Sequence, residues 1–570
     1  MIFNQINKTT FVWLFVLALL RAGTSQEVWL LNAWERALRD SEIGGRREIF
    51  IRAAQNEWES FQILIRSKRK EKVLNITFSD FTGPKGQKIP KDNFVLYREH
   101  QLHIVKGTYR NKNFKPGWYP DALIPLRHPL TGEILKGARF QALPFDLPPN
   151  QTHGFWVDFF VPEGSLPGEY SSKCTVLLEG KGKLQLSLKL EVLPVVLPRR
   201  FSLKTHFGSP AERIIGWVRR QVRKGKLPSE FSPKEIRKVC AKLATDHRIN
   251  TFPPPELLRF KLNPDGSFSL PESRIAALKA FVDRYPVNLI SVPAPHRFFK
   301  DPVREREKIF AYLRSWDKVM SQLGRKDILC CTYPFDEPND REAYEFVRKW
   351  GKIVKEANTK VKVLVTEQTK PQKEQWGNLY GAVDIWVPLF SLFDPQYAEK
   401  RRKLGESIWT YTALCQGRPT PWWHIDFPIY HYRIPCWIAW RYHMEGLLYW
   451  GGMAWWNAVE DPWTDPATYP PPERRRRYVF NGEGSLLYPA FNVGFQGAVP
   501  SMRLKALRDG IEDYEYLKIL ESRGKRKEAE EIVLSVAASW YEWAQDPTEY
   551  VRARERISEL LKLVAKEVKK

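Results

Sequence analysis

The sequence predicts a multidomain α/β protein: an N-terminal antiparallel β-sandwich, a central (β/α)8 TIM-like barrel and a C-terminal helical extension. A chain of 570 residues is too long for one ordinary hydrophobic core, so two or three domains are expected. Short segments of alternating apolar and polar residues come first, and apolar strands alternating with amphipathic helices follow them. The predicted boundaries are 26–197 for the sandwich, 198–500 for the barrel and 501–570 for the extension.

The first 25 residues have the pattern of a secretory signal peptide. Lys8 precedes the apolar run Phe11–Leu20, and the small residues of Ala22–Ser25 follow it. The run is shorter than the about 18 apolar residues that span a bilayer, and no later segment reaches that length. We therefore expect an exported protein, periplasmic or extracellular, with no integral membrane segment after signal removal.

The predicted sandwich is built from period-two segments. Side chains of a strand point alternately to its two faces, so such segments bury one face and expose the other. Turn residues separate them, as in an antiparallel sandwich. Examples are "REIFIRA", "ESFQILIRS", "GFWVDFFVP" and "GEYSSKCTVLLEG". The proline-punctuated segment Leu193–Arg200 is a predicted linker.

Strands and helices alternate after this linker, in the β-then-α order of an enclosed parallel sheet. Eight strands are expected, and that number predicts a closed barrel. They are "FSLKTHFG", "TFPPPELL", "VNLISVPAP", "DILCCTYPF", "VKVLVTEQ", "AVDIWVPLF", "SIWTYTAL" and "GLLYWGGMAWW". The extension is helical, and we interpret its charged "RDGIEDYEYL" segment as a packing and capping element.

Composition excludes several function classes. The formal charge of +25 is scattered along the chain without a nucleic-acid-binding motif, so no nucleic-acid partner is expected. The six cysteines lack metal-ligand spacing, so neither a metal nor another cofactor is expected. Cys330 and Cys331 fall within a predicted strand and are expected to be buried. Sequence alone leaves any disulfide pairing and the oligomeric state open.

Two adjacent carboxylates, Asp336 and Glu337, follow the fourth predicted strand. The active sites of barrel enzymes lie at the C-terminal ends of the strands, where the loops converge. Pro338 disfavours the helical region for Glu337 and should keep that residue extended. A catalytic role is therefore favoured over a solvated turn.

Two acids that are adjacent in sequence suit substrate-assisted glycoside hydrolysis better than a mechanism in which two carboxyl groups flank the sugar. A pair that flanks the sugar needs about 5–5.5 Å or about 6.5–9.5 Å between its carboxyl groups, which neighbours in sequence do not easily provide. In substrate-assisted hydrolysis the 2-acetamido oxygen of the sugar is the nucleophile. Glu337 would be the acid, its pKa raised by Asp336 and by aromatic walls, and Asp336 would orient the amide. Glu367, at the end of the fifth strand, keeps a two-carboxylate mechanism open.

Aromatic side chains near the ends of the strands are the candidates for sugar contacts. The chain has 22 tryptophans, and for each candidate core packing is an equally good explanation. Trp409 and Tyr411, two apart on one strand, should share a face. The substrate-binding candidates are Tyr333, Glu367, Trp386, Trp409, Tyr411, Trp450, Trp455 and Trp456.

Several segments together resemble glycoside hydrolase family 123 and its relatives with the domain of unknown function 4091. They are "YPFDEP", "NEWESFQILIRS", "GFWVDFFVPEGSLPGEY", "GEGSLLYP" and "VPSMRLKALRDGIEDYEYL". The resemblance implies a β-sandwich before a (β/α)8 barrel. It also implies exo-acting, retaining, substrate-assisted β-N-acetylgalactosaminidase activity, with Asp336 and Glu337 as the catalytic pair.

The expected partner is thus a glycan with a terminal N-acetylhexosamine. Two alternatives stay open: a non-catalytic glycan-binding protein on the same scaffold, and a glycosidase for a sugar without an acetamido group that uses Glu367.

Overall fold

The computed structural model describes residues 26–567 except Lys181, Gly266 and 414–418. The predicted signal peptide, residues 1–25, and Cys415 lie outside the described residues. Within the described ranges, no helix is long and apolar enough to cross a membrane.

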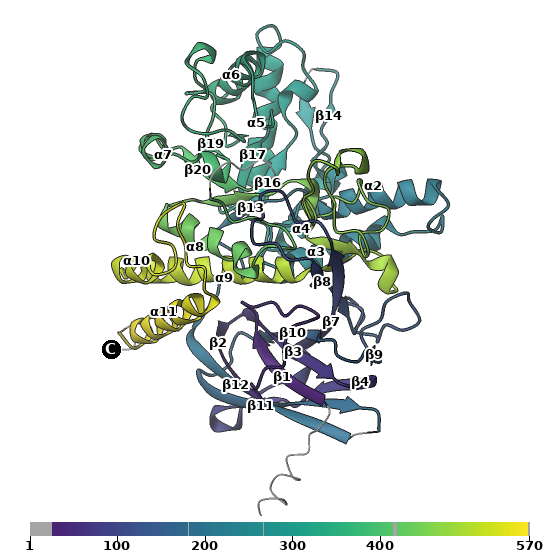
Figure 1. The fold of residues 1–570 in the computed structure, drawn as a ribbon. Helices are drawn as coiled ribbons and strands as arrows, with labels where there is room; N and C mark the ends of the chain where they lie inside the picture. Colours follow the sequence, from purple (N-terminus) through teal and green to yellow (C-terminus); the bar gives the residue numbers. More distant parts are fainter. Residues whose placement is uncertain (1–25, 181, 266, 414–418, 568–570) are drawn as a thin grey trace, which may run out of the picture.

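Two sheets form the N-terminal β-rich domain, in the lower part of Figure 1. The first has the order β1 (Gln26–Asn32), β3 (Glu57–Ser67), β10 (His153–Val161), β7 (Phe94–Ile104) and β8 (Gly117–Pro125). The second has the order β2 (Glu48–Gln55), β12 (Gly182–Val196), β11 (Gly168–Leu178), β4 (Glu71–Phe78) and β9 (Phe145–Leu147), with short β5 (Phe81–Thr82) and β6 (Lys88–Ile89) beside it.

The domain has one parallel pair in an otherwise antiparallel arrangement. β2 runs parallel to β12, whereas the other ladders of the two sheets are antiparallel. Phe61 and Phe155 of the first sheet share one buried core with Val176 and Leu188 of the second. The period-two segments therefore bury one face of each sheet, as the sequence predicts.

The central region has two parallel sheets covered by helices. The first has the order β16 (Leu289–Val292), β17 (Leu329–Thr332), β18 (Lys362–Val365), β19 (Ile385–Trp386) and β20 (Ser407–Ile408), and the second has the order β13 (Lys204–His206), β22 (Gly446–Leu448) and β21 (Thr410–Tyr411). Only Trp409 separates β20 from β21 along the chain. The helices are α2 (Pro210–Arg223), α3 (Pro233–Asp246), α4 (Glu272–Arg284), α5 (Arg306–Gln322), α6 (Arg341–Glu356), α7 (Pro395–Arg402) and α8 (Ile434–Arg441).

The predicted second strand, "TFPPPELL", is not a strand, so a complete (β/α)8 barrel is not confirmed. Three consecutive prolines in this segment have no N–H to donate to a ladder. Asn250 links the neighbouring strands instead. Its N–H donates to Thr205 Oγ1 over 2.8 Å and its Nδ2 donates to the Leu289 carbonyl over 3.0 Å.

Apolar side chains fill the interior of the parallel sheets. Leu289, Cys331, Leu364 and Trp409 belong to this buried cluster. Cys330 is buried as well, as the sequence predicts, and burial raises the pKa of both thiols. Among the described cysteines every thiol is free.

The C-terminal helices are α9 (Met502–Ser522), α10 (Arg526–Leu534) and α11 (Pro547–Glu567). α9 lies between the two larger regions and packs against strands β3 and β8 and against helix α8 (Figure 1). Short strand pairs complete the fold: β14 (Lys261–Leu262) with β15 (Phe268–Ser269), and β23 (Leu487–Pro489) with β24 (Ala498–Pro500).

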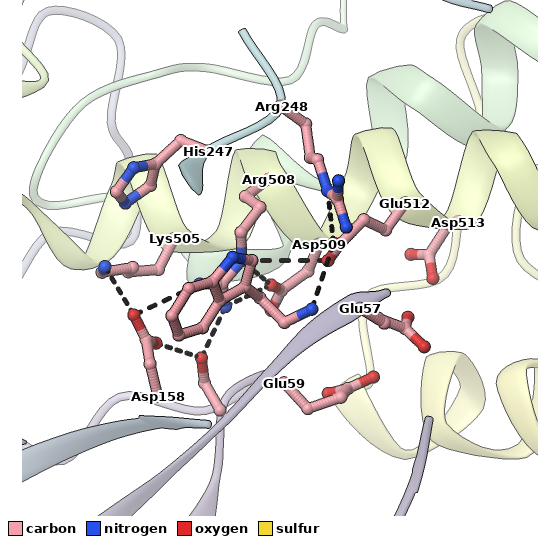
Figure 2. Close-up of polar contacts among 12 residues, drawn as sticks. Glu57, Glu59, Asp158, His247, Arg248, Lys505, Arg508, Asp509, Glu512 and Asp513 are labelled. Atoms are coloured by element: carbon pink, nitrogen blue, oxygen red, sulfur yellow. Dashed lines mark hydrogen bonds and ion pairs between the residues drawn. The ribbon is translucent and has the colours of Figure 1, made fainter. Parts of the chain in front are cut away.

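The charged side chains of α9 from Arg503 to Glu515 are buried, and Figure 2 shows the ion pairs of Lys505, Arg508 and Glu512. Asp158 of β10 accepts from Lys505 Nζ at 2.6 Å and lies 3.2 Å from Arg508 Nη1. Glu512 pairs with Arg248 at 2.7 Å. Burial opposes ionisation of Asp158, but Arg508 and Lys505 hold its pKa below the ordinary value. The "RDGIEDYEYL" segment is therefore a packing element that joins the three regions.

Candidate active site

Asp336 and Glu337 lie just beyond the C-terminal end of β17, and both side chains are exposed. β16, β17 and β18 run parallel, so their C-terminal ends meet at one edge of the sheet. The acid pair is therefore at the end of the sheet where barrel enzymes carry their active sites.

The predicted extended backbone at Glu337 is wrong. Its φ is 47°, in the left-handed region, where a side chain other than glycine costs about 1–3 kcal/mol. Two hydrogen bonds hold this conformation. The Glu337 N–H donates to Thr366 Oγ1 over 2.8 Å, and the Tyr411 hydroxyl donates to Glu337 Oε1 over 2.5 Å. Strain of this kind is typical of positions that a functional site fixes.

Thr366, the residue after β18, joins the two acids through one hydroxyl group. Besides accepting from the Glu337 N–H, Thr366 Oγ1 donates to Asp336 Oδ1 over 2.9 Å and lies 2.9 Å from the Tyr333 hydroxyl. Tyr333 also donates to Asp336 Oδ1. In the described part of the chain, the other carboxylate oxygen, Oδ2, makes no hydrogen bond and remains available. Sequence reasoning missed Thr366, although its place at the end of the strand next to β17 could have indicated it.

Two further rings, the buried Tyr411 and the half-buried His206, lie near the acid pair. Burial, and then the charge of Glu337, raises the pKa of Tyr411, so this hydroxyl keeps its proton. His206, at the end of β13, has its ring centroid 5.8 Å from that of Tyr333. Burial lowers the pKa of His206 to about 4, which leaves a neutral imidazole at pH 7. Sequence analysis did not identify His206.

Glu367 makes no hydrogen bond to Asp336 or Glu337 among the described residues, although the charge of Glu337 is close enough to contribute to the raised pKa of Glu367. Glu367 is 3% exposed, accepts from Gln372 Nε2 at 2.7 Å and interacts with Tyr344 of α6. Burial raises the pKa of Glu367 to about 7. Its surroundings are those of a buried support for the loop, not of a second acid that faces a substrate.

Three of the predicted aromatic contacts are core residues. Trp386 donates from Nε1 to Glu406 Oε2 at 2.6 Å in the layer between sheet and helices. Trp409 fills the sheet interior, on the same face as Tyr411 as predicted, and donates to Ser407 Oγ at 3.2 Å. Trp456 is 1% exposed and donates to the Leu487 carbonyl at 2.9 Å.

Trp450 and Trp455 stay half-buried beyond the end of β22. Leu448 pairs with Tyr411, and Trp450 lies two residues further along on the same face. The two indole rings are 5.1 Å apart, and Arg213 of α2 lies 5.3 Å from the Trp455 ring. Together with Tyr333 and Tyr411, they are the aromatic candidates that the structure brings to the same end of the parallel strands as the acid pair.

The arrangement offers proton transfer by an exposed carboxyl group beside an anchored carboxylate, with aromatic faces nearby. Within the described ranges, no cluster of three or more His, Cys, Asp or Glu side chains could hold a metal ion.

Comparisons with known proteins give one consistent family. Residues 305–520 match the model of the glycoside hydrolase 123 catalytic domain, and residues 45–178 match the glycoside hydrolase 123 N-terminal domain. Among curated proteins, no match was found.

One solved structure shares the fold of this chain, and a second is more distant. A family 123 glycoside hydrolase from Clostridium perfringens, studied for glycolipid glycan hydrolysis, aligns with a TM-score of 0.66 and 15% identity, over 96% of this chain and 99% of that chain. A family 39 glycoside hydrolase from Bacteroides cellulosilyticus has a TM-score of 0.30 and 11% identity, over 77% of this chain and 80% of that chain. The first supports the fold, and the second is too distant to bear on it.

Proposed function

Because the chain belongs to glycoside hydrolase family 123, we propose that it removes terminal β-linked N-acetylhexosamine from glycans, with N-acetylgalactosamine the favoured epimer. Cleavage is exo-acting and retains the anomeric configuration. The observation that carries this proposal is the single hydroxyl of Thr366, which fixes both Asp336 and Glu337 on one side of the site. Such a pair suits a substrate that brings its own nucleophile.

In the first step, the proton of Glu337 moves to the glycosidic oxygen as the bond from that oxygen to the anomeric carbon breaks. The acetamido carbonyl oxygen of the sugar forms the new bond to the anomeric carbon from the opposite face. The product is an oxazolinium ion and a free leaving-group alcohol. Water then attacks the anomeric carbon, Glu337 takes the proton of that water, and two inversions give net retention.

Asp336 orients the acetamido group in this scheme. Its Oδ1 is held by Thr366 and Tyr333, which leaves Oδ2 to accept the amide N–H. The negative charge stabilises the positive oxazolinium ion as it develops. Tyr411 positions Glu337 through its hydroxyl group.

The two alternatives predict different behaviour. A glycosidase with Glu367 as nucleophile is disfavoured because Glu367 is buried against α6. A non-catalytic glycan-binding protein would bind the glycan but not cleave it.

The proposal also includes export of the protein, with residues 1–25 as its signal peptide.

The test compares two 4-nitrophenyl β-glycosides that differ only at carbon 2, where one carries an acetamido group and the other a hydroxyl group. We expect release of 4-nitrophenol from the acetamido glycoside alone. Equal rates on the two would exclude acetamido participation, and no cleavage of either would favour the binding protein.

Replacing Thr366 by valine tests how the pair is held. Valine has the same shape but leaves the Glu337 N–H without its acceptor and leaves Asp336 Oδ1 held by Tyr333 alone, and a lost hydrogen bond of this kind costs about 1–3 kcal/mol. We expect kcat to fall about 10-fold to 100-fold with little change in KM. The substitution loosens the positions of Asp336 and Glu337 but leaves the aromatic side chains that contact the sugar unchanged.

Thr366→Ser is the matched control, because serine retains the hydroxyl group and should retain most of the activity. The hypothesis fails if the valine and serine variants lose activity equally, or if the valine variant keeps the kcat of the wild type.

A further inference from the structure

A loop of the N-terminal domain is built into the surface of the central region. The segment between β7 and β8 reaches the loops that follow β21 and β22 and is tied to them through Asp426. Thr108 donates to Asp426 from its N–H at 2.7 Å and from Oγ1 at 2.6 Å. Asn111 donates to Asp426 at 3.1 Å, and Asn481 donates its N–H to Thr108 Oγ1 at 3.0 Å. Asp426 and Thr108 are buried, so this junction is a fixed part of the fold.

Main-chain contacts extend the junction outward. The Tyr109 N–H donates to the Val479 carbonyl at 2.9 Å. Lys106 Nζ donates to the carbonyl groups of Arg475 and Arg476 at 2.7 and 3.0 Å. The two loops therefore form one continuous surface.

Aromatic rings connect this surface with Trp450, at the same end of the parallel strands as the acid pair. Starting from Trp450, successive ring centroids are separated by 6.0 Å to Tyr469, 6.1 Å to Phe480 and 5.8 Å to Tyr478. Tyr109 lies 6.0 Å beyond Tyr478 and is 42% exposed. Phe480 is 2% exposed, so these rings form a packed connection that passes through the interior, and Tyr109 and Tyr478 are its accessible outer end.

Unpaired cations lie at the outer end of these rings. Arg474, Arg476 and Arg477 are exposed and make no ion pair with any described residue, whereas Arg475 is paired with Asp465 at 2.7 Å. Lys112 on the facing loop is exposed as well. We call this surface the basic ledge, and its residues are Tyr109, Lys112, Arg474, Arg476, Arg477 and Tyr478.

We propose that the basic ledge binds an anionic glycan chain, bearing carboxylate or sulfate groups, whose terminal sugar enters the candidate active site at Asp336 and Glu337. The inference rests on the proposed function and gives its substrate class. Aromatic faces contact sugar rings, and guanidinium groups bind carboxylate or sulfate oxygens in a fork geometry. The aromatic rings that link the ledge to Trp450 distinguish it from the cations scattered elsewhere on the surface.

The experiment uses the full mature chain and two oligosaccharides with the same terminal N-acetylgalactosamine, one sulfated on the inner sugars and one neutral. The ledge variant carries Arg474→Gln, Arg476→Gln and Arg477→Gln. We expect its kcat/KM to fall about 10-fold or more on the sulfated substrate, and to stay within about twofold on the neutral one. High salt should reduce the preference of the wild type for the sulfated substrate.

A charge-matched control carries Lys91→Gln, Lys173→Gln and Lys183→Gln on exposed positions of the N-terminal domain. An equal loss in this control would overturn the proposal, because net charge alone would then explain the effect. An unchanged ledge variant would also overturn it.

Direct binding separates this proposal from the proposed function. Glu337→Gln protein should bind the sulfated oligosaccharide, and the three ledge substitutions should weaken that binding, even if no acetamido glycoside is cleaved. Absence of cleavage would then contradict the proposed function alone. If the substitutions weaken binding to phosphatidylserine vesicles and leave glycan binding intact, the ledge is a membrane contact and the inference is wrong.

Discussion

Glu337→Gln is expected to reduce kcat by about 10²-fold to 10⁴-fold, the usual contribution of a general acid. Glutamine has the same shape but has no carboxyl proton to give to the glycosidic oxygen. The loss should be larger for a sugar alcohol than for 4-nitrophenol, because a poor leaving group needs protonation more. Glu337 is exposed, so the free energy of unfolding should hardly change.

The measurement is steady-state hydrolysis of a natural-type disaccharide and of the 4-nitrophenyl glycoside by the same variant. Glu342→Gln is the matched control, since Glu342 is an exposed glutamate in the first turn of α6 and should be dispensable. Full activity of Glu337→Gln on the disaccharide would remove Glu337 from the mechanism.

Asp158→Ala is expected to lower the free energy of unfolding by about 3–5 kcal/mol, because it leaves Lys505 and Arg508 buried without their counter-charge. Asp158, Lys505 and Arg508, which Figure 2 shows together, are each at most 2% exposed, so bulk water does not screen the two cations. Because the pKa of Asp158 is depressed in the fold, its stabilising contribution is present at neutral pH and is lost as the pH falls through that lowered pKa.

Urea denaturation of wild type and variant measures this effect. Asp283→Ala is the control, since its pair with Lys279 at 2.8 Å lies at the surface and should contribute about 1 kcal/mol or less. Similar losses in the two variants would contradict the claim that burial gives the α9 cluster its importance.

The predictable parts of this protein are those with local sequence signals. Period-two patterns predicted the sandwich core, and an apolar strand ending in two carboxylates predicted where Asp336 and Glu337 lie. The prediction of the second barrel strand was wrong because it gave the apolar content of the segment more weight than its three prolines. Proline has no N–H group to donate to a β-ladder.

Other features depend on contacts between distant segments. Thr366 bonds to a loop about 30 residues away in sequence, and no local pattern shows that its hydroxyl group meets Asp336. The backbone of Glu337 is set by the same contact, which overrides the preference that Pro338 imposes. Trp386 and Trp450 both occur in predicted apolar strands, so sequence does not distinguish them. Their three-dimensional neighbours make Trp386 a core residue and leave Trp450 as a candidate sugar contact.

The central claim is that Asp336 acts on the acetamido group of the substrate. The most direct measurement is kcat/KM for the acetamido and hydroxyl 4-nitrophenyl β-glycosides, each with wild type and with Asp336→Asn. We predict that the substitution greatly reduces cleavage of the acetamido glycoside and removes the advantage that this group confers. If Asp336→Asn lowers both rates by the same factor, Asp336 does not act through the acetamido group, and the substrate-assisted mechanism is contradicted.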